Sequence, residues 1–227
     1  MTSPDFSLFN SRITNKRFME LLNQYGVDHE CPNKAITLIE SVSMYGSFNK
    51  LLLILKKRPN VDSELFSLNI HARKFSIKQL EQIYQLLPDS FFKMNDFLEP
   101  PSFTVMINNH YSQYTKLRIL KLMKQYGIDI HYVCPFNQLG IVDYCFARVP
   151  GEEYMYLAKH LINEFNLNVY RKENYLKSRH LYPSKYHPDF DIAYQLSTSD
   201  EQFYQMLLNF KKQNKNHVNI KDIVFED

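Results

Sequence analysis

Cysteine, histidine and aspartate residues near position 140 raise the possibility of nucleophilic catalysis. Cys134 follows His131 by three residues, and Cys145 follows Asp143 by two. A catalytic thiolate needs a base within hydrogen-bond reach and a third group that orients the base. A cysteine hydrolase using Cys134 or Cys145 is therefore one function that this sequence allows. A free cysteine is more often a small buried hydrophobe, so we expect both cysteines in the core and a protein that is not an enzyme.

Metal and cofactor sites leave recognisable spacings that this sequence lacks. The three cysteines form no C-x-x-C, and the eight histidines show no pair four residues apart on one helix. The chain also lacks G-x-x-x-x-G-K-[ST], G-x-G-x-x-G, G-x-S-x-G and H-E-x-x-H. We therefore expect no metal and no cofactor. Three cysteines without a pairing pattern also suit a reducing, cytoplasmic compartment.

Residues 170–188 form a basic and aromatic segment, with five Lys or Arg, four Tyr and two His. Such interleaving can bind nucleic acid, so a nucleic-acid-binding helical repeat using this segment is a second alternative. The net charge is only +3 and charges of both signs are interspersed, whereas nucleic-acid binding usually needs a clustered basic face. We instead predict an irregular insertion in which Tyr175, Arg179 and Tyr182 contact a protein partner.

The elements that must position these residues are helices. The chain is 44% hydrophobic and 15% aromatic, which excludes disorder, and it holds only 5 glycines in 227 residues. Strand-rich folds need glycine for their tight turns, so few glycines favour helices. The longest apolar run, residues 51–55, is far shorter than the ~20 residues that span a bilayer. The first ten residues lack the pattern of a secretory signal. We expect a soluble monomer without a membrane segment.

An internal repeat organises the helices. The sequence NQYGVD at 23–28 recurs as KQYGID at 124–129, with weaker echoes at 58–62, 166–169 and 216–219. Apolar residues spaced by three and four precede each echo, which predicts amphipathic helices. We expect Gly26 and Gly127 to end helices in left-handed caps, a conformation that glycine takes at little steric cost. The predicted helix pairs are 5–11 with 15–25, 36–44 with 48–57, 65–74 with 77–87, 102–112 with 115–126, 142–149 with 153–165, and 189–196 with 200–212.

Several short stretches resemble the ankyrin repeat: Thr37-Leu38-Ile39, Gly46-Ser47-Phe48, Leu53-Ile54-Leu55 and the run LRILKLMKQYGIDI at 117–130. Gly140 falls at the hairpin glycine of that family. The resemblance implies an all-α, ankyrin-like helical-repeat solenoid of about six helix pairs with short hairpin fingers. Its repeats would span 1–26, 27–60, 61–92, 93–127, 128–169 and 170–227. A helical repeat of the armadillo or HEAT type is the structural alternative.

The resemblance implies a binding function, because ankyrin-like arrays dock partner proteins on their concave, finger-bearing face. The predicted partner-binding residues are His29, Glu30, Asn33 and Lys34 in one finger, and His131, Tyr132, Phe136 and Asn137 in another. Phe136 is expected to project beyond the array. With 19 Asn, 19 Lys and 5 Ala, the chain also resembles effectors of intracellular bacteria and host-range proteins of large DNA viruses. That resemblance makes a host protein a candidate partner and delivery into a host cell a candidate setting.

Overall fold

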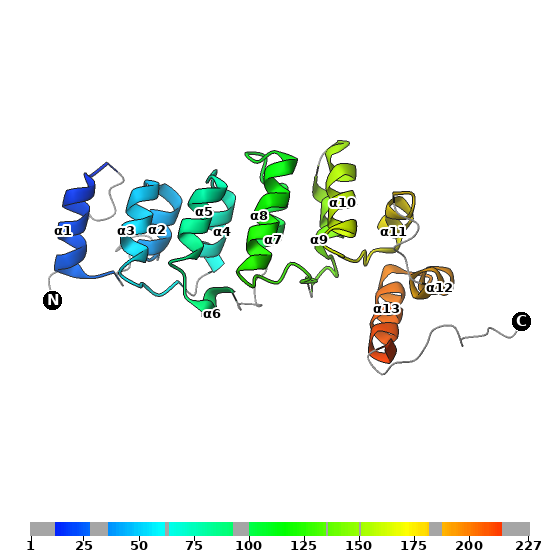
Figure 1. The fold of residues 1–227 in the computed structure, drawn as a ribbon. Helices are drawn as coiled ribbons and strands as arrows, with labels where there is room; N and C mark the ends of the chain where they lie inside the picture. The colour runs from blue at the N-terminus through cyan, green and yellow to red at the C-terminus, as the bar shows by residue number, and fades with distance from the viewer. Residues whose placement is uncertain are drawn as a thin grey trace, which may run out of the picture. The chain divides into compact units, whose positions relative to one another are not determined.

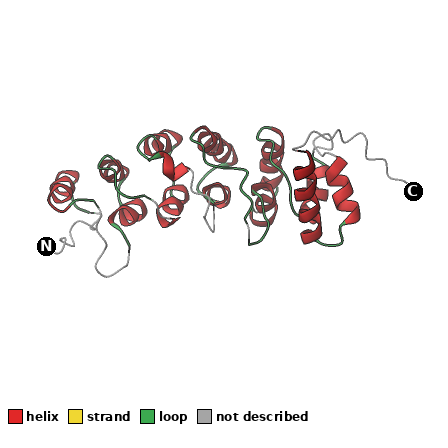
Figure 2. Cartoon of the chain, turned by 90° about the horizontal axis from the view of Figure 1, so that it is seen from below, coloured by secondary structure: helices red, strands yellow, loops and turns green. Residues whose placement is uncertain are grey.

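A computed structural model describes residues 12–27, 36–61, 64–92, 100–134, 136–149, 151–181 and 188–214. Within these ranges the chain forms thirteen α-helices and no strand (Figures 1 and 2). The prediction of an all-α fold is therefore confirmed. The chain divides into two compact units, residues 1–130 and 131–227, which we call the N-terminal and C-terminal units. The expected helix at 5–11 lies outside the described residues.

The N-terminal unit consists of two layers of helices. One layer, here the inner layer, contains α2 (Leu38–Tyr45), α4 (Glu64–Ala72) and α7 (Pro101–Ile107), each packed on the next. The other, here the outer layer, contains α1 (Asn15–Tyr25), α3 (Phe48–Leu55), α5 (Ile77–Tyr84) and α8 (Gln113–Gln125), also packed in order. The short helix α6 (Asp89–Phe92) follows α5 and was not predicted. The two layers therefore alternate along the sequence, as successive helix pairs require.

The outer-layer helices share one register, which a hydroxyl side chain sets. Thr14, Ser47, Ser76 and Ser112 each accept a hydrogen bond from the backbone N–H three residues later, at 3.2–3.3 Å. Such N-caps satisfy backbone donors that a helix leaves unpaired at its start. The residues four, seven and eight positions after each cap are buried: Phe18, Leu21 and Leu22; Leu51, Ile54 and Leu55; Leu80, Ile83 and Tyr84; Lys116, Ile119 and Leu120.

Positive φ angles mark the ends of the repeated helices. Gly26 and Gly127 have positive φ of 87° and 85°. At Gly26 ψ is −166°, outside the left-handed helical region, so the predicted left-handed cap is wrong at this glycine. Arg58 and Asn166, at the start of two of the weaker echoes, have φ of 53° and 57°. Asn tolerates this region better than most residues, whereas Arg takes it at a steric cost. The backbone turn thus persists where its glycine is absent.

Polar side chains join neighbouring inner-layer helices. The Arg73 guanidinium, directly after α4, donates to the carbonyls of Ser43 at 2.6 Å and Gly46 at 2.9 Å, at the end of α2. One helix further on, the Asn108 amide donates to the carbonyls of His71 at 3.1 Å and Ala72 at 2.8 Å. The last carbonyls of a helix lack hydrogen-bond donors within it. Arg73 and Asn108, each directly after the next inner-layer helix, supply these donors.

The C-terminal unit contains α9 (Ile141–Arg148) packed on α10 (Glu153–Asn163), and α13 (Asp200–Asn214) packed on both α11 (Lys172–Arg179) and α12 (Pro188–Leu196). The predicted irregular insertion at 170–188 is wrong in its first half, because 172–179 form α11. Tyr175 on this helix is fully buried, with its ring centroid 5.6–6.0 Å from those of Phe190, Tyr194 and Phe203. Aromatic packing therefore orders this segment.

Candidate functional site

Residues 131–140 of the C-terminal unit form a tight turn, which we call the finger. The Cys134 N–H donates to the Leu139 carbonyl at 3.0 Å, and the Gln138 N–H donates to the Cys134 carbonyl at 2.9 Å. The Asn137 side chain accepts from the Leu139 N–H at 3.0 Å. Cys134 and Leu139 are buried, whereas Phe136 is 77% exposed, the most exposed large hydrophobic residue in the described part of the chain. Phe136 is thus exposed, and its projection beyond a repeat array stays a prediction.

The other predicted finger residues surround Phe136 in sequence. His131 and Asn137 are exposed and Tyr132 is half-buried. The structure thus brings Phe136 and Asn137 into one hydrogen-bonded turn, and His131 and Tyr132 lie a few residues before it in the chain. The first predicted finger, with His29, Glu30, Asn33 and Lys34, lies outside the described residues, so its role stays a prediction.

The three predicted partner contacts of the 170–188 segment have different outcomes. Tyr175 cannot contact a partner because its ring lies in the core and its hydroxyl donates to the Asp191 carboxylate; that assignment was wrong. Arg179 is exposed and lies 3.5 Å from Asp191. Tyr182 lies outside the described residues. Arg171 lies 3.9 Å from Glu173, so acidic side chains offset part of the positive charge that suggested nucleic-acid binding.

Three residues considered for nucleophilic catalysis, Cys134, Cys145 and Asp143, are buried. Cys134 and Cys145 are both buried, and the Cys145 thiol donates to the Tyr154 carbonyl at 3.5 Å. Asp143 is buried and accepts hydrogen bonds from three backbone N–H groups: Tyr170 and Arg171 at 2.8 Å and Gly140 at 3.3 Å. Burial raises the pKa of Asp143 to about 7, and these hydrogen bonds oppose the rise. Asp143 therefore ties α9 to the chain entering α11.

His71 forms a buried polar pair that the sequence did not single out. Its Nδ1 lies 2.7 Å from the Ser67 carbonyl and its Nε2 lies 2.8 Å from the Tyr84 hydroxyl, joining α4 to α5. Burial lowers the pKa of His71 to about 4, although the bond to Ser67 opposes the shift. The sequence offered one indication that His71 is buried: it directly follows Ile70 on the predicted helix 65–74. The pair holds two helices together.

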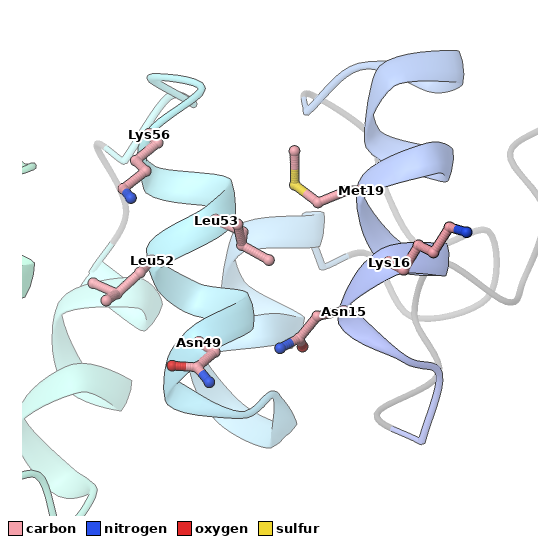
Figure 3. A pocket seen from close by; sticks show the side chains of 7 residues that line it. All are labelled: Asn15, Lys16, Met19, Asn49, Leu52, Leu53 and Lys56. Carbon is pink, nitrogen blue, oxygen red and sulfur yellow. The ribbon is translucent and has the colours of Figure 1, made fainter.

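Two hollows open on the N-terminal unit. The first, of about 400 Å³, lies between α1 and α3 (Figure 3) and is lined by Asn15, Lys16, Met19, Asn49, Leu52, Leu53 and Lys56. The second, of about 750 Å³, lies near the ends of α3 and α5 and is lined by Leu55, Lys56, Arg58, Pro59, Val61, Gln85, Leu86, Leu87, Pro88 and Asp89. Neither lining contains a histidine or cysteine. Asp89 is the single carboxylate among the residues that line them.

No group of three or more His, Cys, Asp or Glu side chains in the described ranges could hold a metal ion. Nor do those ranges contain a helix long and apolar enough to cross a membrane. The fold thus defines the class of protein as all-α and built from successive packed helix pairs. No protein-family model, curated protein or solved structure matches the chain.

Proposed function

We propose that this protein is an ankyrin-like interaction module that docks a partner protein through its finger, without catalysing a reaction. The observation that carries the proposal is the 77% exposure of Phe136 at the tip of a closed turn. Exposing an aromatic ring to water is unfavourable, and aromatic residues dominate the binding energy of many interfaces. A host protein is the proposed partner and the cytosol of a host cell the proposed setting, on the resemblance to effectors.

The geometry of the turn favours binding because it is organised in advance. Three hydrogen bonds within 134–139 join Cys134 to Gln138 and Leu139, and Asn137 to Leu139. A side chain on a fixed backbone loses less conformational entropy when it binds than one on a loop that must order first. Asn137, the next residue after Phe136, is exposed, and polar neighbours of this kind form the rim of an interface. Tyr132 adds a half-buried aromatic ring to the same turn.

The experiment compares Phe136→Ala with a matched control, Tyr114→Ala on α8, whose ring is 63% exposed in the N-terminal unit. Quantitative mass spectrometry of proteins captured from host lysate identifies a partner that the wild type retains and Phe136→Ala loses. Titration of the purified partner should then show binding weakened by at least ~2 kcal/mol, the size of a hot-spot effect. Tyr132→Ala should add to the loss, with the helical circular dichroism unchanged.

The outer layer supplies a second control. Lys121 and Lys124 on α8 are exposed, and their double replacement by alanine should change binding of the same partner little. The proposed docking face is wrong if this pair, or Tyr114→Ala, weakens binding more than Phe136→Ala does.

A further inference from the structure

Helix α3 departs from its layer at one position on the solvent side. Six residues after the capping hydroxyl, α1, α5 and α8 carry the exposed polar residues Glu20, Gln82 and Arg118. At the same register α3 carries Leu53, which is half-buried. The three core positions of α3 are already filled by Leu51, Ile54 and Leu55. Leu53 therefore contributes apolar surface that the core of the unit does not require, and Leu52 beside it is also half-buried.

These leucines border the hollow between α1 and α3. Figure 3 shows Met19 of α1 and Leu53 of α3 facing the gap between the two helices, with Asn15 and Asn49 near one end. Met19 is also half-buried. We call this hollow, with its seven lining residues, the α1–α3 groove. Its volume of about 400 Å³ lies at the small end of the range for binding pockets, roughly 300–1,000 Å³, so it suits a few inserted side chains.

The charge around the groove is positive. Lys16 and Lys56 lie at its margins and are exposed, and neither forms an ion pair with another described residue. Among the described residues, no carboxylate lines the groove. The nearest acidic residue along α1, Glu20, already pairs with Arg17 at 3.2 Å. An apolar floor with two exposed lysines at its margins is complementary to a ligand that joins apolar side chains to carboxylates.

We propose that the α1–α3 groove binds an acidic amphipathic helix of a protein partner. Leucine-like or phenylalanine-like residues of that helix insert between Met19 and Leu53, and its Asp or Glu residues reach Lys16 and Lys56. A groove between two helices is a common seat for an amphipathic helix, whose anchors recur at spacings of three and four. The inference does not depend on the role of Phe136, because the groove lies in the other unit.

The test is selection of a phage-displayed library of helical peptides on the full-length protein. The apolar positions i, i+3, i+4 and i+7 are restricted to Leu, Ile, Phe and Met, and the remaining positions are random. The Leu53→Gln protein serves for counter-selection. It should fold normally, because α5 carries Gln82 at the equivalent exposed position. We expect enriched peptides to be acidic beside their apolar face.

An enriched peptide is then synthesised and titrated by fluorescence anisotropy. Lys16→Glu with Lys56→Glu should weaken its binding roughly tenfold or more, a change of about 1.4 kcal/mol. Lys121→Glu with Lys124→Glu is the matched control and should leave binding of the peptide unchanged. The affinity should also fall as salt is added, because exposed charges are screened. Thermal unfolding of each variant checks that the fold is intact.

Four results would overturn the proposal. Enrichment could yield no peptide that distinguishes wild type from Leu53→Gln, or only neutral or basic peptides. Dodecanoate or anionic vesicles could displace the peptide fully, which would assign the groove to an amphiphile. Sedimentation could show a dimer that Leu53→Gln dissociates, which would assign the groove to a second copy of this chain.

Discussion

Within the N-terminal unit, the hydrogen bonds of His71 with Ser67 and Tyr84 suit the neutral form of the imidazole. A neutral imidazole donates from Nδ1 to the Ser67 carbonyl and accepts at Nε2 from the Tyr84 hydroxyl. A protonated imidazole would donate from both nitrogens, so the Tyr84 proton would need another acceptor. Because both side chains are fully buried, the protonated pair is costly. Desolvation therefore favours the neutral histidine and outweighs the hydrogen bond to Ser67.

This pair predicts acid sensitivity of the N-terminal unit. The pKa of His71 is about 4 when folded and 6.5 in a model peptide. The unfolded chain thus binds a proton that the folded chain excludes, and stability is lost as pH falls from 6.5 to 4. The full effect is up to about 3 kcal/mol. Urea unfolding of His71→Gln across this window should show a flatter dependence on pH than wild type. His110→Gln, at an exposed histidine, should keep the wild-type slope; equal slopes for all three proteins would refute the prediction.

At the scale of the element, helix α13 of the C-terminal unit carries both buried and half-buried apolar residues. Its apolar residues recur at spacings of three and four, which predicts one inward face: Phe203, Met206, Leu207 and Phe210. Phe203 and Leu207 are buried, while Met206 and Phe210 are half-buried. The Ser199 hydroxyl accepts from the Gln202 N–H at 3.3 Å, at the start of the helix. Phe203 and Leu207 lie four and eight residues after this serine, so α13 repeats two core positions of the outer-layer helices.

The contribution of α13 is tested by truncating its buried aromatic ring. Phe203→Ala removes a side chain that contacts Tyr175 and Tyr194 and should lower the free energy of unfolding by about 3–5 kcal/mol. Met206→Ala, one helical turn away and half-buried, should cost clearly less. Chemical denaturation followed by circular dichroism measures both. A Met206→Ala loss equal to that of Phe203→Ala would contradict the assignment of α13 to the core.

For the whole molecule, the two units carry buried groups that respond to pH in opposite directions. Asp143 in the C-terminal unit has a folded pKa of about 7 against a model value of 3.8. Between these values the folded carboxyl keeps a proton that the unfolded one has lost, so this stabilising contribution decreases as pH rises. His71 in the N-terminal unit contributes the reverse between pH 4 and 6.5. Between about pH 4 and 6.5, the two groups therefore change the stability of their units in opposite directions.

Residue-resolved hydrogen exchange can measure this separation. Between pH 4.5 and 6.5, after correction for intrinsic exchange rates, protection of α4 and α5 should increase with pH. Protection of α9 and α11 should decrease over the same interval. Asp143→Asn should abolish the second trend and leave the first unchanged, since the two groups lie in different compact units. Parallel trends in both units would show that other titrating groups dominate.

The sequence by itself determined the features of the protein that depend on local spacing. Apolar residues three and four apart predicted the positions of α1, α3, α5 and α8, because a helix of 3.6 residues per turn places them on one face. The glycine echoes predicted the turns at Gly26 and Gly127, because few residues other than glycine take positive φ at low cost. The expectation that Phe136 lies in a projecting finger came from the resemblance to the ankyrin repeat and not from spacing.

Only the tertiary structure decided which side chains meet across helices. Helix α11 has a polar sequence, KENYLKSR, yet it buries Asn174, Tyr175 and Ser178. Its weak apolar periodicity did not predict that aromatic residues of α12 and α13 would enclose Tyr175. The pairing of His71 with Tyr84 joins residues from two helices, and Met19 and Leu53 line one groove from two helices. Periodicity shows which face of a helix is apolar, but the partner of that face depends on how separate helices pack.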